Sequence, residues 1–221
     1  MVWPAPDVDA RAPLCGALRG PSIGLISMRH PFEVLFFLHI PKTGGVSLSS
    51  ALSEQFLPDE VFHIRNDGLD APIFAPHHGS VAAFRALSWG RRHRMRCVLG
   101  HFHFSEQLHH ATVRPAGYVT FLREPISRII SQLGQFNRMA SRGLLPSHRG
   151  PVSLSEFSSI RPESVNNHQT RFLCGGGFEL HSPEDNLARA KKNLRTWFRV
   201  VGTTERFAES VSVIREVFSL D

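Results

Sequence analysis

The sequence predicts an α/β fold, a P-loop-like three-layer domain in which a mostly parallel central sheet is flanked by helices. Short runs of β-branched and aromatic residues, typical of strands buried on both faces, alternate with helical patterns. A glycine-containing loop joins the first of these runs to the first helix. The length of 221 residues and the hydrophobic content of 42% suit one domain with a substantial core.

The strands and helices are expected in the following order. Strands are predicted at 34–38, 96–99, 118–122 and 198–202. The first strand is followed by a helix that stops before residue 58. Further helices are predicted from Pro125, the favoured first position of a helix, to about 139, then near 153–160, 163–173 and 184–197, and from about 203 to 218. Residues 140–152, polar and marked by Gly and Pro, are predicted to form a loop.

The predicted domain occupies residues 32–221. Residues 1–31 are rich in Pro, Gly and Ala without a clear period, and we expect them to form a loose lead-in. The chain stops directly after the last predicted helix, which leaves open a missing C-terminal piece.

Composition restricts the compartment and the partners. The formal net charge of +6 favours anionic partners, although charge alone does not choose among them, and nucleic-acid binding is not predicted. Three irregularly spaced cysteines form neither a disulfide framework nor a zinc pattern. No signal peptide is visible, and no apolar run approaches the roughly 20 residues of a transmembrane helix. These features predict a cytoplasmic protein without a membrane span.

The segment after the first strand, His39-Ile40-Pro41-Lys42-Thr43-Gly44-Gly45, has the features of an anion site. A glycine turn before a helix directs backbone N–H groups and the helix N-terminus toward one point. Lys42 adds a positive charge, and Thr43 and Ser47 add hydroxyl groups. The segment is not a Walker A motif, and no predicted strand ends in an Asp that would hold Mg²⁺. The alternative is a plain loop with a surface lysine.

Residues 37–47 resemble the 5′-phosphosulfate loop of the carbohydrate sulfotransferases, most nearly the heparan sulfate 2-O-sulfotransferase-like group and its bacterial relatives. Four further segments resemble motifs of that family, in the same order: 100–104 (GHFHF), 121–131 (FLREPISRIIS), 167–173 (NHQTRFL) and 201–207 (VGTTERF). Two departures are Val46, where the family commonly has Thr, and Glu124, where it has Asp.

The resemblance implies a donor and a set of site residues. The donor is 3′-phosphoadenosine 5′-phosphosulfate (PAPS), whose sulfuryl group passes to a hydroxyl-bearing acceptor, a glycan or glycoconjugate, without a metal. The implied donor ligands are Lys42, Thr43, Gly44, Gly45, Val46 and Ser47 at the 5′ side, and Arg123 and Ser131 at the 3′-phosphate. Lys42 and His101 are the implied catalytic residues, with His101 as the base that accepts the acceptor's proton.

Several alternatives remain open at this stage. His103 lies two residues beyond His101 and is the rival base. His39 could also face the pocket, but because it precedes the loop we expect it to pack or hydrogen-bond structurally. Gln169 and Arg171 either touch the acceptor or only brace the nucleotide site. The basic cluster at 91–96 is either a solvated surface or a means of steering an anionic acceptor. The competing functions are a P-loop-like kinase that uses ATP and an inactive nucleotide-binding module.

Overall fold

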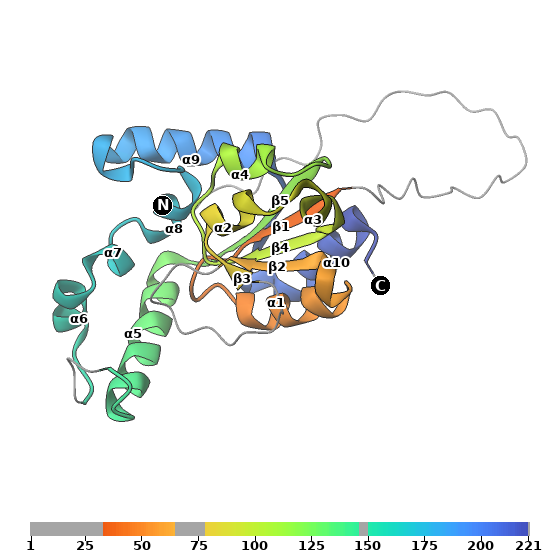
Figure 1. Ribbon diagram of the computed structural model, residues 1–221. Coiled ribbons are helices and arrows are strands. Elements are labelled where there is room, and N and C mark those ends of the chain that lie inside the picture. The colour runs from red at the N-terminus through yellow and green to blue at the C-terminus, as the bar shows by residue number, and fades with distance from the viewer. Residues whose placement is uncertain (1–32, 65–77, 146–149, 221) are drawn as a thin grey trace, which may run out of the picture.

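The computed structural model describes residues 33–64, 78–145 and 150–220, so the predicted lead-in at 1–31 lies outside the described residues. Its centre is a six-stranded sheet in the order β3-β2-β4-β1-β5-β6, in which every pair of neighbouring strands is parallel (Figure 1). The prediction of an α/β fold with a parallel sheet is confirmed.

The four predicted strands are present, and two others accompany them. The strands are β1 (Val34–Leu38), β2 (Val61–Ile64), β3 (His78–Gly79), β4 (Cys97–Gly100), β5 (Ala116–Leu122) and β6 (Phe198–Thr203). The last residue of β1, Leu38, is level with Gly100 of β4 and Thr120 of β5. The chain segments that follow these three strands therefore meet at the carboxyl edge of the sheet.

Helices cover both faces of the sheet. They are α1 (Gly45–Glu54), α2 (Val81–Ala86), α3 (Trp89–Arg94), α4 (Glu106–His110), α5 (Pro125–Ser141), α6 (Leu154–Ile160), α7 (Pro162–Val165), α8 (His168–Leu173), α9 (Pro183–Trp197) and α10 (Phe207–Phe218). Three short 3₁₀ turns lie at Pro58–Glu60, Phe178–Leu180 and Thr204–Arg206. None of the helices in the described ranges is long and apolar enough to cross a membrane.

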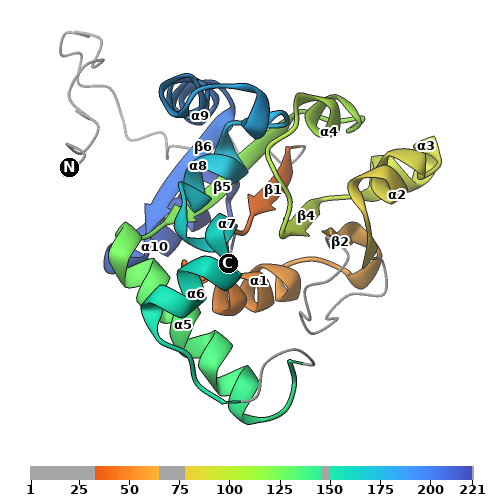
Figure 2. The same ribbon diagram turned by 90° about the vertical axis from the view of Figure 1, so that its left-hand side faces the viewer.

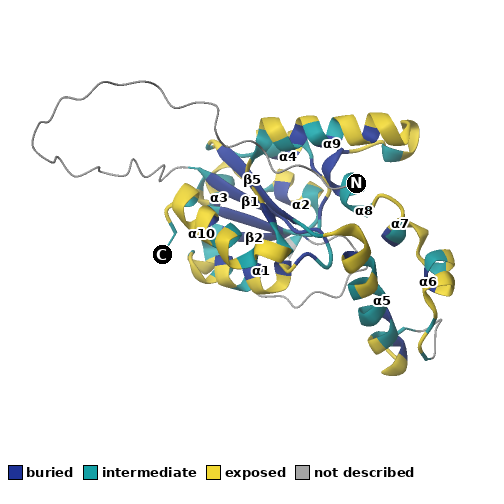
Figure 3. Ribbon diagram, turned by 180° about the vertical axis from the view of Figure 1, so that it is seen from behind, coloured by how far each residue is buried: buried dark blue, intermediate teal, exposed yellow. Residues whose placement is uncertain are grey.

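The side chains of β1 point alternately to the two faces of the sheet and pack in two separate cores. Phe36 and Leu38 pack in one cluster, which includes residues of α2, α4 and α9. Leu35 and Phe37 pack in the other, which includes residues of α1 and α10. Figure 3 shows the buried strands between helices whose outer faces are exposed. Because side chains of a strand point alternately to opposite faces, one fully buried strand divides the core into two layers.

Helices α5, α6 and α7 extend from the carboxyl edge of the sheet, and α8 leads the chain back to it (Figure 2). Phe136 of α5 packs edge-to-face on Phe157 of α6, with ring centroids 5.4 Å apart. Arg128 of α5 is fully buried and donates a hydrogen bond to the carbonyl of Ser164 in α7. Phe104 N donates to the carbonyl of Phe172 in α8 over 2.7 Å. The last of these contacts holds α8 beside the segment that follows β4, and α5 itself begins soon after the end of β5.

Candidate active site at the carboxyl edge

The loop between β1 and α1 is built to present backbone N–H groups. Lys42 and Gly44 both have positive φ angles, 71° and 82°, which turn the chain sharply into α1. Gly44, Val46 and Ser47 are exposed at the N-terminus of this ten-residue helix. An exposed helix N-terminus with unpaired N–H groups favours a bound anion.

Thr43 has a different role from the one expected of its side chain. Its hydroxyl is fully buried and donates a 2.8 Å hydrogen bond to the carbonyl of Ile40. The hydroxyl therefore closes the loop from inside, and the residue can offer an anion only its backbone N–H. Ser47 and Val46 remain on the open side of the loop, where Val46 contributes no hydroxyl.

Gly45 is required by the packing of His39 beneath the loop. A Cβ atom at Gly45 would lie 2.0 Å from Cδ2 and 2.2 Å from Nε2 of the His39 ring. No side-chain carbon fits at such distances unless the ring or the loop moves. The His39 ring is also stacked on Phe37, with ring centroids 5.6 Å apart, so it is held from the other side as well.

We therefore expect Gly45→Ala to destabilise the fold by about 1–3 kcal/mol, the usual cost of overpacking a closed site, and to weaken anion binding at the loop. Gly90→Ala is the matched control, because a Cβ at Gly90 meets nothing within 4 Å. Thermal unfolding of the two variants checks this. Equal stability of Gly45→Ala and wild type would show that His39 can move freely.

His101, the predicted base, immediately follows β4 and contacts the end of β1. Its Nδ1 lies 2.7 Å from the carbonyl oxygen of His39. Because a carbonyl only accepts hydrogen bonds, Nδ1 carries the proton and Nε2 keeps its lone pair. Burial lowers the pKa of His101 below its ordinary value, although the hydrogen bond to His39 raises it by a smaller amount. The ring is therefore a neutral base at pH 7 with a fixed tautomer.

His39, which the sequence predicted to pack or hydrogen-bond structurally, contacts His101 directly. Its ring lies against the ring of His101, with centroids 4.2 Å apart, and its backbone carbonyl fixes the His101 tautomer. Burial, then repulsion from a protonated His101 and from Lys42, hold the pKa of His39 well below its ordinary value. A neutral His39 adds no charge that would oppose protonation of His101.

His103, the rival base, lies in a different setting. Its ring packs edge-to-face on Phe172 of α8, with centroids 4.8 Å apart. Burial and the charge of Arg171 lower the pKa of His103, so it too is neutral at pH 7. The described part of the chain provides no hydrogen bond that would fix its tautomer. The geometry therefore favours His101 as the base over His103.

Arg123 follows β5 and reaches the anion loop. Its Nη1 donates a 3.3 Å hydrogen bond to the carbonyl of Lys42. Its backbone N–H donates to Oε1 of Gln169 over 2.9 Å, and its carbonyl accepts from Nε2 of Gln169 over 2.8 Å. The side-chain amide of Gln169 thus binds both the N–H and the carbonyl of Arg123. Ser131 lies eight residues further, within α5.

The sequence left open whether Gln169 and Arg171 contact the acceptor or brace the nucleotide site. In the structure both side chains form contacts with other residues of the chain. Arg171 Nε donates to the carbonyl of Asn166 over 3.1 Å, and its Nη1 forms an ion pair with Glu179. Its guanidinium also lies over the ring of Phe178, 3.8 Å from the centroid. Both side chains therefore brace α8 and the strand end of β5 in this structure.

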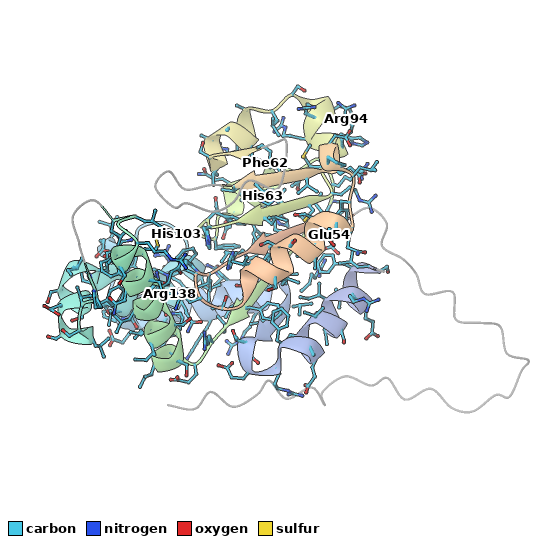
Figure 4. All side chains as sticks on the ribbon, turned by 90° about the horizontal axis from the view of Figure 1, so that it is seen from below. Glu54, Phe62, His63, Arg94, His103 and Arg138 are labelled. Atoms are coloured by element: carbon cyan, nitrogen blue, oxygen red, sulfur yellow. The ribbon has the colours of Figure 1, made fainter. Side chains whose placement is uncertain are left out.

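The positive charges near the loop come from three elements. Burial, then Arg138, then Arg123 lower the pKa of Lys42. Arg138 lies on α5, as labelled in Figure 4, and no sequence motif indicated it. The only sequence signal is its seven-residue spacing from Ser131, which places both on one side of a helix. Within the described ranges, no ion pair involves Lys42, Arg123 or Arg138. Such uncompensated cations suit a ligand with several negative charges.

The acidic, histidine and cysteine side chains bear on whether a metal ion could bind at this edge of the sheet. The described residues contain no group of three or more His, Cys, Asp or Glu side chains that could hold a metal ion. β5 ends at Leu122 and is followed by Arg123, where a magnesium-binding site would need a carboxylate.

Comparisons with known proteins include a sequence relative and a structural neighbour. No protein-family model matches the sequence. Human heparan-sulfate 6-O-sulfotransferase 1 is 25% identical to this chain, and the match covers 85% of the chain. This chain spans only 54% of the length of that relative. The finding confirms the predicted resemblance to carbohydrate sulfotransferases, although the relative is named for the 6-O and not the 2-O position.

The structural neighbour is more distant. Mouse sulfotransferase SULT7A1, solved in complex with PAP, is 11% identical and has a TM-score of 0.46. The match covers 86% of this chain and 58% of the neighbour.

Proposed function

We propose that this chain, through the domain at 32–221, is a PAPS-dependent sulfotransferase that acts on a hydroxyl group of a carbohydrate. The observation that carries the proposal is the position of His101. A neutral base, whose Nε2 has no hydrogen-bond partner among the described residues, lies beside an anion loop that is joined to Arg123. The five family-like segments and the similarity to a heparan-sulfate sulfotransferase support the same conclusion.

In this proposal His101 Nε2 accepts the proton of the acceptor hydroxyl as its oxygen attacks sulfur. The donor supplies an activated sulfuryl group whose S–O bond breaks, which leaves the electron pair on the 5′-phosphate oxygen. Lys42 and the backbone N–H groups at the start of α1 stabilise that negative charge. The carbonyl of His39 stabilises the imidazolium formed on His101 through the hydrogen bond from Nδ1. The products are a sulfate ester and adenosine 3′,5′-bisphosphate.

The residues present fit such a donor. Lys42, Arg123 and Arg138 carry positive charges without ion pairs to carboxylates in the described residues. Arg123 has a planar guanidinium that can form paired hydrogen bonds to a phosphate. Its backbone is fixed by Gln169, so its side chain starts from a rigid position. We assign Arg123, together with Ser131, to the 3′-phosphate.

Nucleotide choice tests this assignment and the proposed function together. Wild type should bind adenosine 3′,5′-bisphosphate at least about tenfold more tightly than AMP, because a charge-assisted phosphate contact contributes about 1.5–3 kcal/mol. Arg123→Ala should remove most of that preference by weakening only the bisphosphate. Calorimetry on the four combinations measures it, with Arg142→Ala, an exposed arginine at the end of α5, as control.

Two outcomes of this calorimetry would contradict different parts of the proposal. An unchanged preference in Arg123→Ala would remove Arg123 from the 3′-phosphate site. No preference in wild type would reject the sulfotransferase, and tighter binding of ADP with Mg²⁺ would support the ATP-dependent kinase instead. The acceptor is then identified by a screen with labelled PAPS across glycans, glycolipids and small alcohols.

A further inference from the structure

A surface around α3 has an unusual concentration of positive charge. It consists of Trp89, Arg91, Arg92, His93, Arg94 and Arg96, which we call the α3 surface. Cations at the C-terminus of a helix are favoured by its dipole, which accounts for part of this charge. Within the described ranges, however, Arg92, Arg94 and Arg96 form no ion pair. The dipole effect does not require so many cations in one place.

Contacts with neutral groups fix two of these arginines without neutralising them. Arg92 Nη1 donates a 3.3 Å hydrogen bond to the carbonyl of Ala111, the residue that follows α4. The Arg96 guanidinium lies 6.0 Å from the centroid of the Phe56 ring. The Nε atoms of both arginines are buried without a hydrogen-bond partner among the described residues. These contacts leave the positive charges of Arg92 and Arg96 uncompensated, which favours binding of a multivalent anion.

An exposed aromatic ring lies within the same surface. Trp89 is 63% exposed, which is high for so large an apolar side chain. It stacks on His93, with ring centroids 5.0 Å apart and an angle of 15° between the planes. The stack holds the indole as a flat apolar platform on α3. Tryptophan and arginine together are the residues most enriched at binding surfaces.

The α3 surface lies away from the candidate active site. β4 separates them, because Arg96 precedes the strand and His101 follows it. At about 3.3 Å per residue, the two positions are roughly 16 Å apart along the strand. Figure 4 shows Arg94 and His103 at well-separated places on the molecule. A short ligand at His101 therefore cannot also contact α3, whereas a polymer can.

We propose that the α3 surface is a second docking site for an anionic polysaccharide that carries sulfate or carboxylate groups. Its arginines bind the negative groups, and Trp89 packs on the apolar face of a sugar ring. The choice of a polysaccharide over a nucleic acid rests on the proposed function, which makes the acceptor a carbohydrate. A chain docked on α3 raises the local concentration of its own hydroxyl groups at His101.

The binding test uses heparin as the probe, in long chains and as a disaccharide. Arg91→Gln/Arg94→Gln should weaken binding of long heparin about tenfold and reduce its salt dependence, because screened charge contacts are lost. Trp89→Ala should weaken it by a similar factor with unchanged salt dependence. The control is Lys192→Gln/Arg195→Gln, which removes two exposed cations from α9 and should change binding less than about twofold.

Four outcomes separate this inference from its alternatives. Unchanged binding of adenosine 3′,5′-bisphosphate in the α3 variants shows that their folded site is intact. An equal loss in the α9 control would overturn the α3 surface as a specific site. Tighter binding of polyuridylate than of heparin would identify a nucleic-acid site instead. If wild type binds heparin through α3 but does not bind the bisphosphate, the sulfotransferase proposal fails and the docking site stands.

Discussion

Replacement of His101 by alanine is expected to lower the rate of sulfuryl transfer by about 10²–10⁴-fold, the usual contribution of a general base. Affinity for adenosine 3′,5′-bisphosphate should stay within about twofold of wild type, because the base acts on the acceptor and not on the nucleotide. The hydrogen bond from Nδ1 to His39 is lost at the same time. His101→Gln fills most of the volume of the lost ring but provides no base, so it separates the loss of packing from the loss of the base. Single-turnover rates and calorimetry on both variants provide the measurement.

The pH dependence of kcat/KM gives a second readout for the same residue. His101 must be neutral to accept a proton, so the rate should rise with pH as the imidazolium loses its proton. Burial lowers the pKa of His101, so this acidic limb should lie below the ordinary histidine pKa of about 6.5. The limb should vanish in His101→Ala. If it vanishes in His103→Ala and persists in His101→Ala, the base is His103.

The main features of the fold could be predicted because they depend on local sequence. β1, β4, β5 and β6 are apolar runs followed by turn or loop signals, and all four were predicted. β2 and β3 were not predicted, because both are too short to show a hydrophobic period. β2 has four residues, one of them His63, and β3 has two. The helix predicted at 163–173 is two helices, because Asn167 takes a left-handed conformation with φ of 50°. Asparagine tolerates that conformation, and helical periodicity does not reveal it.

The site could be predicted in its location but not in its internal contacts. The motifs brought Lys42, His101 and Arg123 to one edge because parallel strands end there together. The bond from Thr43 to Ile40 depends on loop dihedrals that include a positive φ at Lys42, which the sequence does not specify. The contact between Gln169 and Arg123 joins residues 46 positions apart, so it belongs to the tertiary packing of α8. Arg138 belongs to no motif, because its position near Lys42 also depends on tertiary packing.

Replacement of Lys42 by alanine is expected to reduce turnover by about 10²–10³-fold, because one donor to a developing negative charge contributes about 3–4 kcal/mol. The thermal unfolding temperature should change little, since Lys42 is only partly buried and its side chain forms no ion pair with described residues. Its carbonyl still accepts from Arg123 in the variant, so the loop keeps that contact. Lys192→Ala on α9 is the matched control for the loss of one lysine.

Lys42→Arg separates the effect of the positive charge on turnover from the effect of its exact position. Burial and the charges of Arg138 and Arg123 lower the pKa of Lys42, so the basic limb of the rate profile should begin below the ordinary lysine value of about 10.4. Arginine does not lose its proton in that range, so Lys42→Arg should retain part of the rate and lose the basic limb. If Lys42→Ala keeps more than about a tenth of the wild-type rate, Lys42 contributes less than about 1.4 kcal/mol to the transition state. Charge stabilisation would then have to come from Arg138 and the N-terminus of α1.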